Sequence, residues 1–110
     1  MICFLTGATG YVGSALAEKL VRDGHTVHAL YRSFSKARPL QHPRIRWFHG
    51  DLLDPSRLEE AMRGCLCAFH TGAQTGLWSK KPDSFREVNV QETKNVMECA
   101  VRAGIHKVVV

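Results

Sequence analysis

The sequence lacks a long apolar run. Nowhere in its 110 residues does an apolar stretch approach the roughly 20 residues of a membrane-spanning helix. The chain begins MICFL, without the basic segment that opens a signal peptide. We therefore expect no membrane partner and interpret the first residues as a strand. A chain of this length accommodates one domain with a modest core.

No metal site is indicated by the spacing of the cysteines. The four cysteines include no Cys-x-x-Cys pair, and no histidine follows them at zinc-finger spacing. Cys3, Cys65 and Cys67 lie within apolar, strand-like runs. This pattern favours buried free thiols in a reducing compartment, the cytoplasm, over disulfides or a bound metal.

Acidic residues are absent between Arg32 and Arg46, a segment with five basic side chains in a chain of net charge +5. Such a segment suits an anionic partner, nucleotide phosphate or nucleic acid, and a solvated face is the alternative. Apart from Phe34 and Trp47, no aromatic rings are interleaved with these basic side chains. Because base stacking needs more interleaved aromatics, we expect no nucleic-acid partner.

What the sequence does have is a regular alternation of strand and helix patterns. Apolar runs and helical spacing predict strands at residues 2–6, 26–31, 44–48, 65–70 and from 107, and helices at residues 11–23, 55–63 and 83–103. The order predicts an α/β fold, a Rossmann-type doubly wound parallel sheet with strand order 3-2-1-4-5 and one domain over residues 1–110. Because Val110 falls inside the fifth strand, we expect an incomplete piece without its substrate-binding part. Its exposed sheet edge would favour self-association.

Apolar spacing also predicts which helix faces are buried. On the first helix it selects Val12, Ala15, Leu16 and Leu20. On the last helix it selects Phe85, Val88, Asn89, Thr93, Val96, Met97 and Ala100. Asp54 is the predicted N-cap of the middle helix, followed by Pro55 at the first helical position.

A glycine-rich stretch, TGATGYVG at residues 6–13, joins the first strand to the first helix. Gly7 permits a tight turn, Gly10 lets the backbone approach a pyrophosphate, and Gly13 lets the helix pack against the strand. The helix N-terminus would face the negative charge, with backbone N–H groups from Thr9, Tyr11 and Val12. The alternative is a tight turn without a ligand.

The end of the second predicted strand indicates which dinucleotide would bind. An NAD site usually has an acid there for the ribose 2′-hydroxyl, whereas this chain has Arg32 and Ser33 and no acid before Asp51. Because arginine pairs with a 2′-phosphate, we favour NADP over NAD. Alternatively, Arg32 only covers the sheet edge in solvent.

Two further strand ends carry candidate residues. Asp51 would accept a hydrogen bond from the adenine amino group, with Leu52 packed on the ring; capping of the turn by Asp51 is a compatible alternative. Small residues follow the fourth strand beside the switch point and would let the backbone run close to the cofactor: Thr71, Gly72 and Ala73. We interpret His70 as a packing or hydrogen-bonding residue. Asn89 is either a buried amide bonded to nearby backbone or a support for a cofactor-side loop.

Four stretches in order resemble the extended short-chain dehydrogenase/reductase superfamily: residues 6–13, 50–54, 69–73 and 88–96. The chain is most similar to its dihydroflavonol-reductase and sterol-dehydrogenase-like branch, alongside the NAD-dependent epimerase/dehydratases. The resemblance implies a Rossmann fold, bound NAD(P), and hydride transfer to or from a carbonyl or hydroxyl carbon of a small-molecule substrate. It also assigns the pyrophosphate, 2′-phosphate and adenine roles to the residues named above, with Asn89 supporting the site.

The catalytic residues of that superfamily have no counterpart here. Its Ser/Thr follows the fifth strand, and its Tyr-x-x-x-Lys comes later still, where the tyrosine exchanges a proton with the substrate oxygen. The tyrosines of this chain are Tyr11 and Tyr31, with Ala15 and Ser35 four positions on. We therefore expect no catalytic residue in these 110 residues and no turnover by them alone. A non-catalytic dinucleotide-binding or redox-sensing module is the alternative function.

Overall fold

The computed structural model describes residues 1–8, 10–31, 41–71 and 82–109, with side chains from residue 90 onward in the last range. Its centre is a five-stranded parallel sheet in the order β3-β2-β1-β4-β5. The strands are β1 (Ile2–Thr6), β2 (Thr26–Tyr31), β3 (Ile45–His49), β4 (Cys67–His70) and β5 (Lys107–Val109). The helices described are α1 (Tyr11–Arg22), α3 (Pro55–Met62) and α4 (Pro82–Ala103). The predicted Rossmann-type sheet and its strand order are confirmed.

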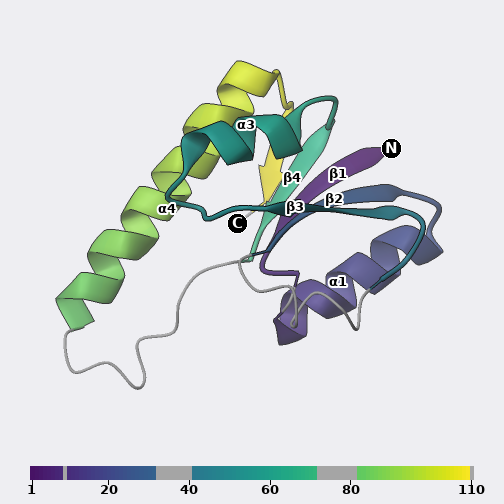
Figure 1. Ribbon diagram of the computed structural model, residues 1–110, viewed down its shortest axis with the longest axis horizontal. Helices are drawn as coiled ribbons and strands as arrows, with labels where there is room; N and C mark the ends of the chain where they lie inside the picture. Colours follow the sequence, from purple (N-terminus) through teal and green to yellow (C-terminus); the bar gives the residue numbers. More distant parts are fainter. Residues whose placement is uncertain (9, 32–40, 72–81, 110) are drawn as a thin grey trace.

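Different helices cover the two faces of the sheet (Figure 1). On one face, Leu20 of α1 shares a core cluster with Leu5 of β1. On the other, Leu58 of α3 and Val96 of α4 share a second cluster with Phe4. Because consecutive strand residues point to opposite faces, Phe4 and Leu5 anchor the two layers, and β1 is apolar on both sides. Both side chains are fully buried.

The middle helix begins as predicted. Asp54 Oδ1 accepts a hydrogen bond from the backbone N–H of Ser56 at 3.2 Å and another from the Ser56 hydroxyl at 2.7 Å. These bonds hold the pKa of the Asp54 carboxyl below its ordinary value. Pro55 occupies the first turn, where its missing N–H leaves no bond unmade. Asp54 is thus confirmed as the N-cap of α3.

The predicted buried face of α1 is partly wrong. Val12 and Ala15 are exposed, and the buried positions are Gly13, Ala17 and Leu20. The helix is rotated because Gly13, rather than an apolar side chain, makes the closest contact with the preceding turn.

On α4, Val96 and Ala100 are buried as predicted, whereas Met97 is 44% exposed. Two polar side chains, Glu92 and Asn95, are buried on that face instead. Apolar periodicity cannot select such residues, because they enter the interior by hydrogen bonding rather than by apolar transfer. Thr93 is half-buried, and the remaining predicted positions, residues 85, 88 and 89, have no side-chain description.

Strand boundaries differ slightly from the predictions. Cys65 does not belong to β4, because its N–H donates to the Met62 carbonyl oxygen at 3.0 Å and so completes the turn after α3. All four cysteines are buried, as predicted. Burial raises the pKa of Cys3 and of Cys65 to about 12, so both remain neutral thiols that act as packing groups. Within the described ranges, no helix is long and apolar enough to cross a membrane.

Candidate functional site

The candidate site lies where the carboxyl ends of β1 and β4 meet. Thr6, the last residue of β1, pairs with His70, the last residue of β4. The chain leaves β1 for α1 on one face of the sheet, and α4 follows β4 on the other face (Figure 1). Doubly wound sheets bind their ligands at such a switch point, outside the carboxyl ends of the strands.

The glycine turn after β1 has the geometry that its sequence predicts. Gly7 has a φ of 74°, in the left-handed region that favours glycine. Its carbonyl oxygen accepts a hydrogen bond from the Gly10 N–H at 2.9 Å, which closes the turn. A Cβ added to Gly13 would overlap the Gly7 carbonyl group, so α1 packs on the turn at a separation that only glycine permits. The predicted tight turn and close helix packing are confirmed.

The N-terminus of α1 is open to a ligand. Gly10 is its N-cap, and among the residues that the structure describes no side chain caps the helix or adds an acid to its first turn. Tyr11 is 93% exposed and Val12 is 66% exposed, so neither side chain is buried in the core. A helix N-terminus carries unpaired N–H groups and partial positive charge, which suit an anion. Thr9, the other predicted contributor, lies outside the described residues.

Thr71 lies directly against the glycine turn. Its N–H donates to Thr6 Oγ1 at 2.9 Å, and its hydroxyl donates to the Thr6 main-chain oxygen at 2.6 Å. A Cβ added to Gly7 would come within 2.5 Å of Thr71 Oγ1. Gly7 is therefore required both for its φ and for the space that Thr71 occupies. The structure confirms that Thr71 adjoins the turn; Gly72 and Ala73 lie outside the described residues.

His70 is a hydrogen-bonding residue, as predicted. It is 5% exposed, with Nδ1 at 2.8 Å from Thr6 Oγ1 and Nε2 at 3.1 Å from Thr93 Oγ1. Burial lowers the pKa of its imidazole, which favours the neutral form. Thr93 was selected from the sequence only as a helix-face residue, and its contact with His70 across 23 positions could not be read from local spacing.

Asp51 caps the turn after β3. Its Oδ1 accepts a hydrogen bond from the Leu53 N–H at 3.0 Å, which confirms the capping alternative. The Leu52 side chain is 8% exposed and belongs to the core beneath α3 and α4, so it is not free to pack on an adenine ring as expected. The sequence analysis also missed Asn95, whose Nδ2 donates to the Leu52 carbonyl oxygen at 2.9 Å and ties this turn to α4.

The remaining predicted site residues are only partly described. Arg32 and Ser33 lie outside the described residues. Asn89 lies on α4, but its side chain is not described. Tyr31, just before Arg32, is half-buried and packs edge-on against Trp47 with ring centroids 6.0 Å apart. This contact packs the last residue of β2 against β3. No metal-binding cluster of His, Cys, Asp or Glu occurs among the residues that the structure describes.

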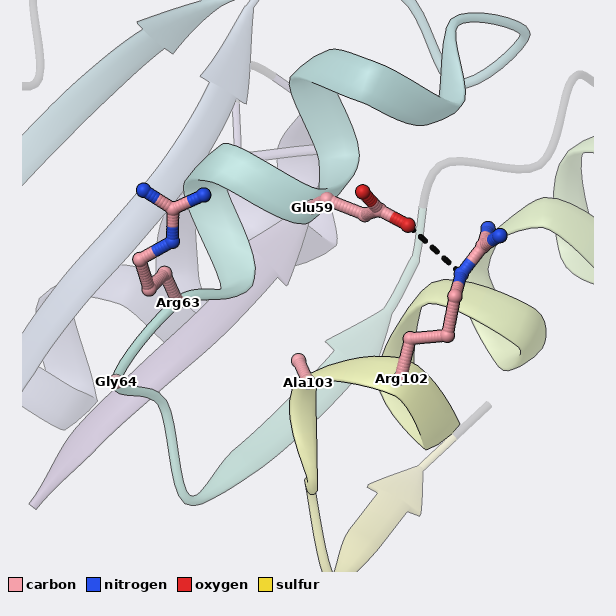
Figure 2. A pocket seen from close by; sticks show the side chains of 5 residues that line it. All are labelled: Glu59, Arg63, Gly64, Arg102 and Ala103. Carbon is pink, nitrogen blue, oxygen red and sulfur yellow. Dashed lines mark ion pairs between the residues drawn. The ribbon is translucent and has the colours of Figure 1, made fainter.

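A surface hollow of about 400 Å³ lies at the other end of the sheet (Figure 2). Its lining includes Arg102, whose Nε donates to Glu59 Oε1 at 2.7 Å, and Gly64. These residues end α3 and α4, just before β4 and β5 begin. The hollow is therefore beside the amino ends of the strands and forms no part of the candidate site.

Comparison with known proteins identifies curated relatives. The chain is 41% identical over 106 residues to a putative dihydroflavonol 4-reductase of Synechocystis, covering 96% of this chain and 31% of the relative. It is 37% identical over 109 residues to a 2-alkyl-3-oxoalkanoate reductase of Stenotrophomonas maltophilia, covering 99% of this chain and 32% of the relative. The chain thus spans about a third of the length of each relative.

Solved structures and a family model agree with these relatives. The dTDP-glucose 4,6-dehydratase DesIV of Streptomyces venezuelae, solved with NAD bound, matches with a TM-score of 0.83 and 28% identity. The match covers 98% of this chain and 38% of the DesIV chain. The model of the NAD dependent epimerase/dehydratase family matches residues 3–110. The predicted resemblance is confirmed, and the chain belongs to the NAD-dependent epimerase/dehydratase family.

Proposed function

We propose that this chain binds a nicotinamide dinucleotide and forms the cofactor-binding part of an oxidoreductase or epimerase-like enzyme. One observation carries the proposal: the N-terminus of α1, which begins at a glycine N-cap without a side chain, lies against a turn that its glycines make possible. Backbone N–H groups at such a helix end hold a pyrophosphate without any charged side chain. The membership of the chain in an NAD-dependent family supports the same ligand.

Three segments of the chain have a binding role in this proposal. The turn at Gly7, Gly10 and Gly13 holds the pyrophosphate, and Thr71 with the two residues after it borders the ribose. Asp51, half-exposed beyond the carboxyl end of β3, accepts a hydrogen bond from the adenine amino group. When bound, the dinucleotide supplies or accepts the hydride that is exchanged with a carbonyl or hydroxyl carbon of a small-molecule substrate.

We further propose that NADP is preferred over NAD. The support is the sequence at the end of β2, where Arg32 and Ser33 stand and no acid is present to bind a ribose 2′-hydroxyl. Guanidinium groups pair with phosphate through two parallel hydrogen bonds, which a hydroxyl cannot match.

Titration of the intact protein with NADPH and NADH tests both proposals. We expect NADPH to bind about tenfold more tightly, a difference of about 1.4 kcal/mol, and Arg32→Ala to abolish that difference. Arg22→Ala, at the far end of α1 from the glycine turn, is the matched control and should leave both affinities unchanged. Failure to bind either dinucleotide would refute the proposed function. Equal affinities in both the wild type and Arg32→Ala would refute the NADP preference alone.

Residues 1–110 do not contain the acid/base residues that catalysis in this superfamily uses. We therefore expect the purified 110-residue chain to reduce no carbonyl substrate with either cofactor. Cofactor-dependent carbonyl reduction by this chain would contradict the expectation. It would also show that the proton is supplied by a residue other than a Tyr-x-x-x-Lys tyrosine.

A further inference from the structure

We infer that His70 is a positioning residue, which fixes the glycine turn by linking Thr93 of α4 to Thr6 at the end of β1. The inference rests on the proposed function, in which the turn holds a pyrophosphate. It adds the far side of the sheet to the site, because α1 and α4 lie on opposite faces (Figure 1). Through the two hydrogen bonds of His70, the position of α4 influences the position of the turn that precedes α1.

Both ring nitrogens of His70 have partners. Nδ1 lies 2.8 Å from Thr6 Oγ1, and Nε2 lies 3.1 Å from Thr93 Oγ1. A neutral imidazole has one donor and one acceptor, and a hydroxyl serves as either, so both tautomers satisfy the two contacts. The ring is therefore held at two points, on different elements, and cannot rotate without losing a hydrogen bond.

Two further contacts connect Thr6 to the glycine turn. Thr6 Oγ1, which His70 contacts, also accepts the Thr71 N–H at 2.9 Å. Thr71 in turn occupies the space beside Gly7, where an added Cβ would meet its hydroxyl at 2.5 Å. A shift of Thr6 or Thr71 therefore moves the Gly7 carbonyl oxygen. This oxygen accepts the hydrogen bond from the Gly10 N–H at the start of α1.

The burial of His70 indicates that the hydrogen bonds of its imidazole matter to the structure. The residue is 5% exposed, and most neighbouring positions on β4 are apolar. Burying an imidazole has a desolvation cost that an apolar side chain of similar volume would avoid. The two hydrogen bonds offset that cost and specify one arrangement of β1, β4 and α4, which apolar packing alone specifies less tightly.

Thr93→Val tests the link at its most distant point. The substitution preserves the side-chain volume and removes the hydroxyl that contacts His70. Thr93 is not itself among the residues proposed to bind the cofactor. We expect the dissociation constant for NADPH to rise about fivefold in the intact protein, the range for one net hydrogen bond. Thr93→Ser retains the hydroxyl and should restore the wild-type value. Lys94→Ala, an exposed neighbour on the same helix, is the matched control.

A second ligand separates positioning from general destabilisation. Adenosine 2′-phosphate lacks the pyrophosphate, so it does not use the glycine turn. We expect Thr93→Val to weaken NADPH and to leave the affinity for adenosine 2′-phosphate unchanged. Equal weakening of both ligands, or no weakening of either, would overturn the inference. If circular dichroism shows Thr93→Val to be unfolded, His70→Asn provides the same comparison, because its amide reaches Thr6 but is too short for Thr93.

Hydrogen exchange without ligand distinguishes a failure of this inference from a failure of the proposed function. We expect Thr93→Val to accelerate exchange of the Gly10 and Ser14 amides, which are bonded to Gly7 and Gly10 carbonyl oxygens at 2.9 Å. Lys94→Ala should not do so. If the wild type binds no dinucleotide, the proposed function fails while the exchange result still decides the role of His70. Unchanged exchange at these amides would overturn that role.

Discussion

Glycines occur at both edges of the sheet, but for different reasons. At the amino edge, Gly24, Gly64 and Gly104 follow the three helices that the structure describes. Their φ values are 90°, 82° and 75°, and a Cβ added at any of them would meet no described neighbour within 4 Å. At the carboxyl edge, an added Cβ on Gly7 or Gly13 would meet neighbouring backbone. The first set serves only the left-handed conformation that ends a helix. The second set leaves room for neighbouring backbone, and only Gly7 in it also has the left-handed conformation. The close backbone packing distinguishes the edge where we propose that a ligand binds.

Gly13→Ala should give the largest effect, because its Cβ would overlap the backbone carbonyl group of Gly7. We expect the free energy of unfolding to fall by about 3 kcal/mol, at the upper end for an overpacked site. Urea denaturation monitored by circular dichroism measures it. A loss below that of Gly64→Ala would remove the proposed distinction between the two edges.

Gly10→Asp tests whether the N-terminus of α1 is open for an anion. Gly10 has extended backbone at φ −89° and ψ 176°, which suits an N-cap aspartate. The carboxylate would take the N–H groups and repel a phosphate, so NADPH affinity should fall about tenfold, or 1.4 kcal/mol. Gly10→Ala adds a Cβ but no acceptor, so it measures the steric part of the loss, and Gly10→Asp should lose more. Unchanged affinity in Gly10→Asp would show that phosphate does not bind there.

Gly64→Ala should cost about 1 kcal/mol, because only the left-handed backbone opposes it. Gly64→Asn should cost less, since asparagine adopts that conformation more readily. Thermal unfolding of both variants measures the difference. A cost for Gly64→Ala as large as that of Gly13→Ala would mean that space limits both edges.

The smallest expected effect is a pH dependence from His70. Burial lowers its folded-state pKa below the ordinary value of 6.5, so the unfolded chain binds the proton more readily. The contribution of His70 to stability is therefore complete above about pH 6.5 and decreases as the pH falls below it. Urea unfolding at pH 7.5 and 5.5 should show a smaller loss in His70→Gln than in the wild type. An equal loss would assign the pH dependence to other groups.

The sequence predicts the sheet order and the roles of Gly7 and Gly13 because these follow from local spacing and chain connectivity. It selects His70 as a hydrogen-bonding residue but not its partners, because Thr6 is 64 positions away. It misses Asn95 for the same reason, since the Leu52 carbonyl oxygen to which that side chain donates lies 43 positions earlier. Apolar periodicity also misplaces Val12, because a glycine sets the rotation of α1. Polar contacts between elements that are distant in the sequence therefore cannot be predicted from local sequence patterns.

The pairing of Thr6 with His70 also determines when the site can exist during synthesis. β1, α1 and β2 are complete by residue 31, so the glycine turn and its helix can form early on the ribosome. Thr71, which borders Gly7, emerges 65 residues after Thr6. Thr71 can therefore pack against the turn only after β4 has paired with β1. This pairing is non-local and is expected to form late. A nascent chain that ends before residue 71 would contain every glycine of the motif and still lack the Thr71 side of the proposed site.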